Sequence, residues 1–261
     1  LVLHCPARRP PMTLTPTDID RHKRHILLKE IGGPGVQKLR AASVSIVGAG
    51  ALGGPCALYL AAAGIGQIEI WDDDLVDRSN LQRQIQFGEA DVGRPKAEIL
   101  AARLQDAHPD SHIRWHRHRW SESHPLAGEI LVDASDNYPT RYALNAIAHA
   151  THRPMVHGAA AGWTGQVSVF ASGVQADAPC YRCWVPETPP DAQACDEVGV
   201  VGALTGIVGA SMALEVVKLV TGAGKPLVGR LLLLDGLAGT QRTVGLKKDA
   251  TCRDCNGSDT D

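Results

Sequence analysis

The sequence lacks an excess of charge of either sign, because 26 Lys and Arg residues face 28 Asp and Glu residues, a formal net charge of −2. This near balance gives no reason to expect nucleic acid or an anionic membrane as the main partner. The composition of a disordered or collagen-like chain is also absent, since 44% of the residues are hydrophobic and 21% are charged. The 261 residues therefore predict a globular protein with one large domain.

An uninterrupted apolar run long enough to span a membrane is missing as well. The most apolar stretch, residues 198–220, approaches that length but contains Glu215 and Lys218. Its glycines recur at three- and four-residue spacing, which is typical of a buried helix packed closely on another element. These glycines are Gly199, Gly202, Gly206 and Gly209. We therefore expect a cytoplasmic protein without a membrane segment.

No interior segment is rich enough in glycine, serine or proline to separate two domains. Residues 1–17 contain four prolines and lack the apolar core of a signal peptide, so we expect a flexible tail there. A second tail is expected over residues 258–261, with a single domain over residues 18–257. Residues 187–193 form the one interior stretch with the composition of a mobile loop.

Cysteine is too rare for a disulfide scaffold, and the count of seven is odd. Four cysteines form two C-x-x-C pairs, Cys180 with Cys183 and Cys252 with Cys255, a spacing that lets thiolates point at one tetrahedral metal. The pairs predict a structural Zn²⁺ ion, and the alternative is two unrelated reduced pairs. Four sulfur ligands leave no open position, so this zinc would join the C-terminus to the middle of the chain without taking part in catalysis. Cys56 is expected to be a small buried hydrophobe.

Strands and helices alternate along the first part of the chain. Residues 43–47 predict a short apolar strand that leads into the turn Gly48-Ala49-Gly50-Ala51-Leu52-Gly53 and a helix to about Ala63. A second strand, Ile68 to Trp71, ends at Asp72 and completes a βαβ unit. Further predicted elements are helices over 96–107, 138–151 and 202–220 and strands over 130–133, 155–158, 166–171, 230–235 and 241–246. The order predicts an α/β fold with a Rossmann-like, mostly parallel sheet and mixed C-terminal strands.

A G-x-G-x-x-G turn after a strand serves many nucleotide enzymes, so an NAD-dependent dehydrogenase is the first alternative. In that interpretation Asp72 would bind the ribose, and the polar residues that follow it would have no role. Those residues include Asn80 and Arg83, at the carboxyl edge where doubly wound sheets bind ligands. Lys96 opens the next helix, where it is either an anion-binding group or a solvated surface lysine. Residues 133–137 follow another parallel strand, where a carboxylate can hold Mg²⁺ against phosphate oxygens.

Together these motifs resemble the ThiF/MoeB/HesA family, bacterial relatives of the ubiquitin-activating enzymes. The resemblance covers about residues 18–257, and seven motifs in the same order carry it. They are Gly48-Ala49-Gly50-Ala51-Leu52-Gly53, Asp72-x-Asp74, Ser79-Asn80-Leu81-Gln82-Arg83-Gln84, Val92-Gly93-Arg94-Pro95-Lys96, Asp133-Ala134-Ser135-Asp136-Asn137, Pro179-Cys180-Tyr181-Arg182-Cys183 and Cys252-x-x-Cys255.

The resemblance implies an ATP-dependent adenylyltransferase that acts on the C-terminal Gly-Gly carboxylate of a ubiquitin-like sulfur carrier (ThiS- or MoaD-like) and releases pyrophosphate. By motif position it assigns the nucleotide to Gly48, Gly50, Gly53, Asp72 and Asp74, with Asp72 at the ribose. It assigns the phosphates to Asn80, Arg83 and Lys96, and a Mg²⁺ ion to Asp136. A glycyl carboxylate is already ionised at neutral pH, so catalysis should consist of alignment and charge stabilisation.

Two further residues gain a role only from the resemblance. Arg24, in an Arg-x-x-Arg-x-Ile segment, would reach the ATP site of the other subunit of a homodimer, whereas alone it belongs to a basic solvated face. Cys195 matches a cysteine that some relatives use for thioester or acyl-disulfide transfer. The carboxylates of Asp196 and Glu197 raise the pKa of a neighbouring thiol and a helix N-terminus lowers it, so the sequence leaves a covalent role open. No rhodanese-like segment is present, which implies a separate sulfur donor.

Three other interpretations compete with parts of this assignment. A related adenylyltransferase of the tRNA modified-base dehydratase type would activate another carboxylate, but the zinc cysteines favour the sulfur-carrier branch. A zinc-stapled scaffold that binds a ubiquitin-like protein without catalysis would have lost Arg83, Lys96 and Asp136, which are present. The alternating histidines His112, His116 and His118 are either metal ligands or part of a solvated edge strand, and the neighbouring arginines favour the edge strand.

Overall fold

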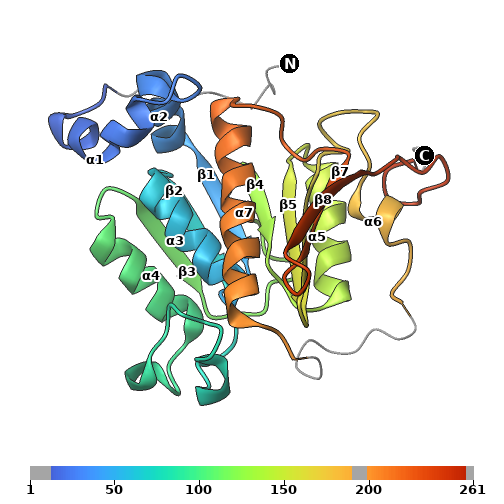
Figure 1. The fold of residues 1–261 in the computed structure, drawn as a ribbon, viewed down its shortest axis with the longest axis horizontal. Helices are drawn as coiled ribbons and strands as arrows, with labels where there is room; N and C mark the ends of the chain where they lie inside the picture. Colours follow the sequence, from blue (N-terminus) through green and yellow to red (C-terminus); the bar gives the residue numbers. More distant parts are fainter. Residues whose placement is uncertain (1–12, 190–198, 257–261) are drawn as a thin grey trace.

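The computed structural model describes residues 13–189 and 199–256. Within these residues eight strands form one sheet in the order β3-β2-β1-β4-β5-β6-β7-β8 (Figure 1). The strands are β1 (Ser43–Val47), β2 (Gln67–Trp71), β3 (His112–His116), β4 (Ile130–Asp133), β5 (Met155–Ala161), β6 (Thr164–Phe170), β7 (Arg230–Asp235) and β8 (Thr240–Gly245). Strands β1 to β5 pair in parallel, and β5 to β8 pair antiparallel. The predicted mostly parallel sheet with mixed C-terminal strands is confirmed.

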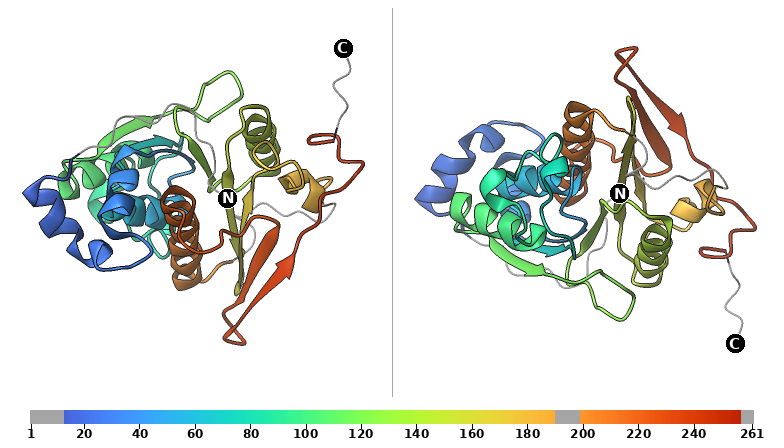
Figure 2. Two further views of the ribbon diagram at one scale, coloured as in Figure 1. Left: turned by 90° about the horizontal axis from the view of Figure 1, so that it is seen from above. Right: turned by 90° about the horizontal axis from the view of Figure 1, so that it is seen from below.

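Helices cover both faces of this sheet. The first face carries α3 (Gly53–Ala63), α4 (Lys96–Ala107) and α7 (Gly202–Thr221). The opposite face carries α5 (Tyr138–Ala150), and Figure 2 shows α5 and α7 on opposite sides of the strands. The shorter helices are α1 (Pro16–Ile26), α2 (Gly32–Ala41) and α6 (Tyr181–Trp184), with 3-10 turns η1 (Arg78–Asn80) and η2 (Glu89–Asp91). A doubly wound sheet of this kind buries its central strands completely.

The central strands are almost fully buried because both of their faces are covered. All four residues of β4 are buried, and in β1 and β2 only the first residue is partly exposed. A short, mostly apolar run that ends at glycine or aspartate is a strong local signal. For this reason the sequence predicted these three strands to within one residue.

Helix α7 is long and apolar enough to cross a membrane by length and composition alone, but half of its most apolar window is buried. It packs against α3, β5 and β6. Close packing is confirmed at Gly202 and Gly209, where an added Cβ would lie within 2.6 Å of a backbone oxygen of another segment. The same prediction is wrong for Gly199 and Gly206, which have no neighbouring atom within 4 Å of that position because they face open space.

Helix α1 begins inside the segment predicted to be a tail. The Thr15 hydroxyl accepts a hydrogen bond from the Asp18 N–H (3.1 Å), and the Asp18 carboxylate accepts one from the Thr15 N–H (2.9 Å). This reciprocal capping box orders the residues that precede the helix. Residues 1–12 and 257–261 lie outside the described residues.

The same helix lies at the amino ends of the central strands. Arg21 donates a hydrogen bond to the carbonyl of Ala107, the last residue of α4 (3.1 Å), and His22 lies against Gly64, which ends α3. Because α3 and α4 run opposite to the strands they follow, both ends lie at the amino edge of the sheet. Figure 1 shows α1 and α2 at this end of the strands and the segment that follows β2 at the other.

Strand β3 forms one edge of the sheet and carries His112 and His116, whereas His118 lies two residues beyond its end. The ring of His116 stacks on Trp71 at 3.7 Å between ring centroids, and its Nε2 lies 3.2 Å from the Glu69 carboxylate. His112 is exposed. In the described part of the chain no histidine belongs to a cluster of metal-ligating side chains. The edge-strand interpretation therefore holds, with His116 as a packing residue.

Candidate active site and metal centre

The glycine turn, residues 48–53, is so tight that Gly48 and Gly53 have no room for a side chain. Gly48 has φ +100°, and an added Cβ there would lie 2.5 Å from the carbonyl oxygen of Ala134, which follows β4. An added Cβ at Gly53 would lie 1.7 Å from the Gly48 carbonyl oxygen. The turn therefore closes on itself and against the end of β4, and an alanine at either position would push the two segments apart.

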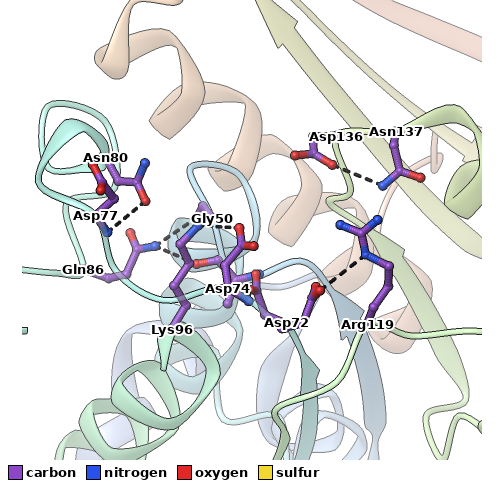
Figure 3. A network of polar contacts seen from close by, with 12 residues as sticks. Gly50, Asp72, Asp74, Asp77, Asn80, Gln86, Lys96, Arg119, Asp136 and Asn137 are labelled. Carbon is purple, nitrogen blue, oxygen red and sulfur yellow. Dashed lines mark hydrogen bonds and ion pairs between the residues drawn. The ribbon is translucent and has the colours of Figure 1, made fainter. Parts of the chain in front are cut away.

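The glycine turn lies where the order of the strands in the sheet reverses. From β1 the chain proceeds outward to β2 and β3 on one side, whereas β4 and β5 lie on the other. Ligands bind outside the carboxyl ends of parallel strands at such a point. The glycine turn at the end of β1 and the loop of Asp136 after β4 therefore flank the place where this rule puts a ligand, which we call the crevice. In Figure 3 Asp136 lies on one side of Gly50, and Asn80 and Gln86 lie on the other.

Asp72, directly after β2, fixes the position of the glycine turn. Its carboxylate accepts hydrogen bonds from the Ala49 N–H (2.6 Å) and the Asp74 N–H (2.9 Å). Removal from water raises the pKa of the Asp72 carboxyl, although these two bonds and the Lys96 charge oppose the change. A carboxylate at the end of the second strand is where a nucleotide ribose is bound in doubly wound folds.

Lys96 is buried rather than a solvated surface lysine, so that alternative is wrong. Only 7% of its side chain is exposed, and its Nζ lies 2.8 Å from the Asp74 carboxylate. The Lys96 N–H also donates to the Asp74 carbonyl oxygen (3.0 Å), so the first turn of α4 is tied to the segment that follows β2. A buried cation held by one carboxylate next to the glycine turn is suited to an anionic ligand.

Asn80 and Arg83 come from the segment around η1. The Asn80 carboxamide accepts a hydrogen bond from the Asp77 N–H (3.3 Å) and closes this turn. Arg83 is half-buried, and its Nη1 donates to the Ser79 carbonyl oxygen (3.1 Å). An added Cβ at Gly202, the first residue of α7, would lie 3.1 Å from the Arg83 Cα. The start of α7 therefore braces the segment that presents both side chains.

The loop that carries Asp136 is held by a buried acid–base pair. His157 Nδ1 lies 2.7 Å from the Asp133 carboxylate, and neither side chain is exposed. Burial alone would raise the pKa of the Asp133 carboxyl, but the bond and charge of His157, with Arg141 and Ser135, hold it below its usual range. The Ser135 hydroxyl donates to the same carboxylate (2.6 Å). The loop is therefore fixed at Ser135, the residue before Asp136, where it lies against Gly48.

A cavity of about 610 Å³ extends from Asp136 across the antiparallel half of the sheet. Asp136, Tyr138 and Arg141 line it together with alanine and glycine residues of β5 and β6 and with residues of β7 and β8. The glycine turn and Asp72 do not line it. The loop after β4 therefore connects the two, because Ala134 contacts Gly48 of the glycine turn and Asp136, two residues later, lines the cavity.

Arg141 and Gln86 are residues of this region that the sequence analysis missed. Arg141 is buried, donates to the Ser135 carbonyl oxygen (3.1 Å) and lies over the Tyr138 ring at 5.0 Å. Its signal was its position four residues after Asn137, which caps α5, since that spacing places it on the same helix face. Gln86 donates to two carbonyls of the glycine turn, and no sequence motif marks it.

Carboxylates that can hold a divalent cation lie on both sides of the crevice. Asp72, Asp73 and Asp74 bring their oxygens within 4.8 Å of one another. Asp136 belongs to no group of three ligating side chains among the described residues. A Mg²⁺ ion at Asp136 would therefore take most of its oxygen ligands from phosphates and water, which is its usual mode in nucleotide sites.

The four paired cysteines form one cluster. The Sγ atoms lie 3.8 Å apart between Cys180 and Cys183, 3.5 Å between Cys180 and Cys252, and 3.4 Å between Cys183 and Cys255. Four thiolates bound at 2.3 Å to a tetrahedral Zn²⁺ lie about 3.8 Å apart, so the cluster fits this ion. The cluster can hold zinc and leaves no open coordination position.

Both cysteine pairs are tied to α5 by one buried side chain. The Asn145 carboxamide accepts from the Tyr181 N–H (2.7 Å) and donates to the Asp254 carboxylate (2.8 Å). Arg182 also donates to Asp254 (2.7 Å). Such outer contacts orient the ligands of a metal site. Because α5 begins beside Asp136, the cluster supports the helix that carries one side of the crevice.

The remaining predicted residues lie away from the crevice. Arg24 is exposed on α1, at the amino edge of the sheet, opposite to the glycine turn. Cys56 is fully buried in α3, and burial raises the pKa of its thiol to about 12, which confirms it as an inert core residue. Cys195 lies outside the described residues.

Comparisons with known proteins agree with this arrangement. The sequence pattern of the ThiF family matches residues 22–254. The chain is 42% identical over 253 residues to the SAMP-activating enzyme E1 of Haloferax volcanii, covering 94% of this chain and 91% of that protein. It is 39% identical over 257 residues to the sulfur carrier protein adenylyltransferase of Thermus thermophilus, covering 95% of each. The fold matches the crystal structure of E. coli MccB with MccA-N7isoASN at a TM-score of 0.80 and 19% identity, covering 94% of this chain and 76% of that one.

Proposed function

The chain belongs to the ThiF family, and we propose that it is an adenylyltransferase that uses ATP to activate the C-terminal carboxylate of a ubiquitin-like sulfur carrier protein. One observation carries this proposal: the loop after β4 packs on the glycine turn at Ala134 and lines the cavity over β5 to β8 at Asp136, two residues later. A reaction that joins a nucleotide to a polypeptide end needs two such spaces that meet at one point. The names of the two relatives favour a sulfur carrier over a modified tRNA base.

In this proposal ATP occupies the crevice, with the ribose at Asp72 and the phosphates near Asn80, Arg83 and Lys96. The carrier's last residues enter the cavity, where the small side chains of Ala159–Ala161 and Gly165 leave space for an extended chain. One carboxylate oxygen attacks the α-phosphorus, the bond from that phosphorus to the bridging oxygen breaks, and pyrophosphate leaves. The attacking carboxylate is already ionised near neutral pH, so no residue has to remove a proton.

The main obstacle is the repulsion between the carboxylate and the triphosphate. Lys96 and Arg83 supply positive charge in a partly dehydrated site, where a charge interaction is stronger than in water. A Mg²⁺ ion held by Asp136 would offset the charge that moves onto pyrophosphate. The chain itself aligns the two anions, because Asp72, the glycine turn and the Asp133–His157 pair fix the groups around them.

Exchange of labelled pyrophosphate into ATP tests this function directly. We expect exchange only when a carrier protein with a C-terminal Gly-Gly is added, and a panel of such carriers would identify the pathway. A carrier that lacks its last glycine is the matched control. NAD-dependent hydride transfer with no exchange for any carrier would return the dehydrogenase interpretation to first place.

We further propose a homodimer in which Arg24 completes the ATP site of the partner subunit. The position of Arg24 supports this idea, because within its own chain it lies at the opposite edge of the sheet from the glycine turn. A separate protein would donate the sulfur. Any covalent step at Cys195 would follow adenylation. The enzyme would work in the cytoplasm.

Mixing two inactive variants is expected to restore activity if Arg24 acts across the dimer. An Arg24→Ala chain paired with an Asp136→Ala chain holds one intact site, and random mixing then restores about a quarter of the wild-type exchange rate. Each variant alone is the control. No recovery, with mixed dimers demonstrated by differently tagged chains, would show that Arg24 has no role in the neighbouring site.

A further inference from the structure

Gln86 joins the two segments that are proposed to hold ATP. It follows the segment of Asn80 and Arg83, and its Nε2 donates to the carbonyl oxygens of Ala49 (2.9 Å) and Gly50 (3.0 Å) in the glycine turn (Figure 3). Its side chain is buried, with 3% of the residue exposed. A single carboxamide therefore holds two successive peptide groups of the turn.

These two bonds determine which way the turn presents its N–H groups. The carbonyl of Ala49 shares a planar trans peptide with the N–H of Gly50, and the carbonyl of Gly50 shares one with the N–H of Ala51. Gln86 holds both carbonyls, that of Gly50 together with the Gly54 N–H (3.0 Å), and this points both N–H groups to the opposite side. Within residues 13–189 and 199–256 these two N–H groups donate to no other group. Successive N–H groups with this orientation, at a turn before a helix, are suited to phosphate oxygens.

The surroundings of Gln86 leave room for this contact and for little else. An added Cβ at Gly54 would lie 2.2 Å from the Gln86 carboxamide, so the side chain reaches the turn only because residue 54 is glycine. On the other side of the segment, an added Cβ at Gly202 would lie 2.5 Å from the carbonyl oxygen of Gln82. The segment is thus pressed between α7 and the glycine turn, and Gln86 is its polar contact with the turn.

We propose that Gln86 is a positioning residue for the nucleotide site, which sets the orientation of the glycine turn and its register with Asn80 and Arg83. It does not itself touch the reacting atoms. The inference rests on the proposed function in one respect, that the turn binds a nucleotide.

The test is Gln86→Met, which keeps the length of the side chain and removes the two donated bonds. We expect ATP alone, measured by calorimetry without carrier, to bind about 10-fold more weakly, because the Ala49 carbonyl loses its donor and the Gly50 carbonyl keeps only the Gly54 N–H. In pyrophosphate exchange the KM for ATP should rise by a similar factor, and the KM for the carrier should stay unchanged. Hydrogen exchange at Ala49 and Gly54, whose N–H groups donate to Asp72 and to the Gly50 carbonyl, should be faster than in the wild type.

Gln105→Met is the matched control, because Gln105 Nε2 also donates to two backbone carbonyls, those of Pro109 (3.2 Å) and Ser111 (3.1 Å), but at the amino edge of the sheet. Its ATP affinity should equal that of the wild type. Unchanged ATP affinity in Gln86→Met, or an equal loss in Gln105→Met, would overturn the proposal.

A folding defect and a failure of the proposed function can both be distinguished from a failure of the role proposed for Gln86. If Gln86→Met does not fold, Gln86→Asn shortens the side chain by one methylene while keeping it polar, and it should show the same selective rise in the KM for ATP. If the wild type binds no ATP, the proposed function fails, whereas hydrogen exchange at Ala49 and Gly54 still reports on whether Gln86 holds the turn. Unchanged hydrogen exchange in a folded variant contradicts that role in either case.

Discussion

Asp136→Ala is expected to slow carrier-dependent ATP–pyrophosphate exchange by about 100- to 1000-fold. A fully engaged charge contact in a site of this kind contributes about 3 to 4 kcal/mol to the transition state, which corresponds to that range. Asp136 lines the cavity and lies two residues after Ala134, which packs on the glycine turn, so its loss removes the carboxylate proposed to bind the ion between the two substrates. The fold should persist, because the loop is held by Asp133 and Ser135 rather than by Asp136.

Lys96→Ala and Arg83→Ala should slow exchange within the same range. The Lys96 substitution is the sharper test, because its partner Asp74 keeps 57% of its side chain exposed and can be solvated without it. Lys38→Ala is a matched control: Lys38 Nζ donates to the Thr221 carbonyl oxygen (2.9 Å) in a partly buried position at the other end of α7. Exchange by that variant should match the wild type.

Cys195→Ala separates adenylation from any later covalent step. No thiol takes part in the attack of a carboxylate on ATP, so exchange should remain nearly intact in this variant. A wild-type rate in Asp136→Ala, or a loss of similar size in well-folded Cys195→Ala protein, contradicts the assignment of the charge-stabilising groups.

The parts of the site that the sequence predicted are those that depend on short-range patterns. The strand before the glycine turn, the acidic end of β2 and the loop after β4 each follow a buried apolar run, and parallel strands bring such ends to one edge. This geometry is why Gly48, Asp72 and Asp136 could be placed near one another without coordinates. The cysteine pairs were predictable for a similar reason, since their spacing carries the ligand geometry.

Other features depend on contacts between segments that no local pattern encodes. In the sequence Lys96 looks like an ordinary surface lysine at the start of a helix. Only the fold of the segment after β2 buries it beside Asp74. Gln86 has no distinctive spacing, and its role follows from the absence of a side chain at Gly54. Gly206 and Gly209 belong to the same series of glycines at three- and four-residue intervals. Gly206 faces open space, whereas Gly209 packs on α3, because the intervals alone do not define which face of α7 is covered.

Removal of the metal is expected to have the largest effect on stability. The purified protein should carry about one Zn²⁺ per chain, and the double variant Cys180→Ser and Cys252→Ser should carry none. The two cysteine pairs come from distant parts of the chain and share Asn145 and Asp254 as supports, so without the metal the segment after β8 loses its attachment to α5. A structural zinc site stabilises a fold by several kcal/mol, and a domain of this size loses about 2–4 °C of Tm per kcal/mol.

We therefore expect Tm to fall by about 10 °C or more in the double variant, measured by calorimetry alongside elemental analysis. Cys56→Ala is the control, because Cys56 is a buried cysteine outside the cluster, and its zinc content should remain at about one per chain. At a temperature where the double variant is still folded, its exchange rate should fall less than that of Asp136→Ala, since a closed four-sulfur shell acts through the position of α5 and not on the reacting atoms. Protein purified without chelator that contains no zinc, or full zinc retention by the double variant, would rule the site out.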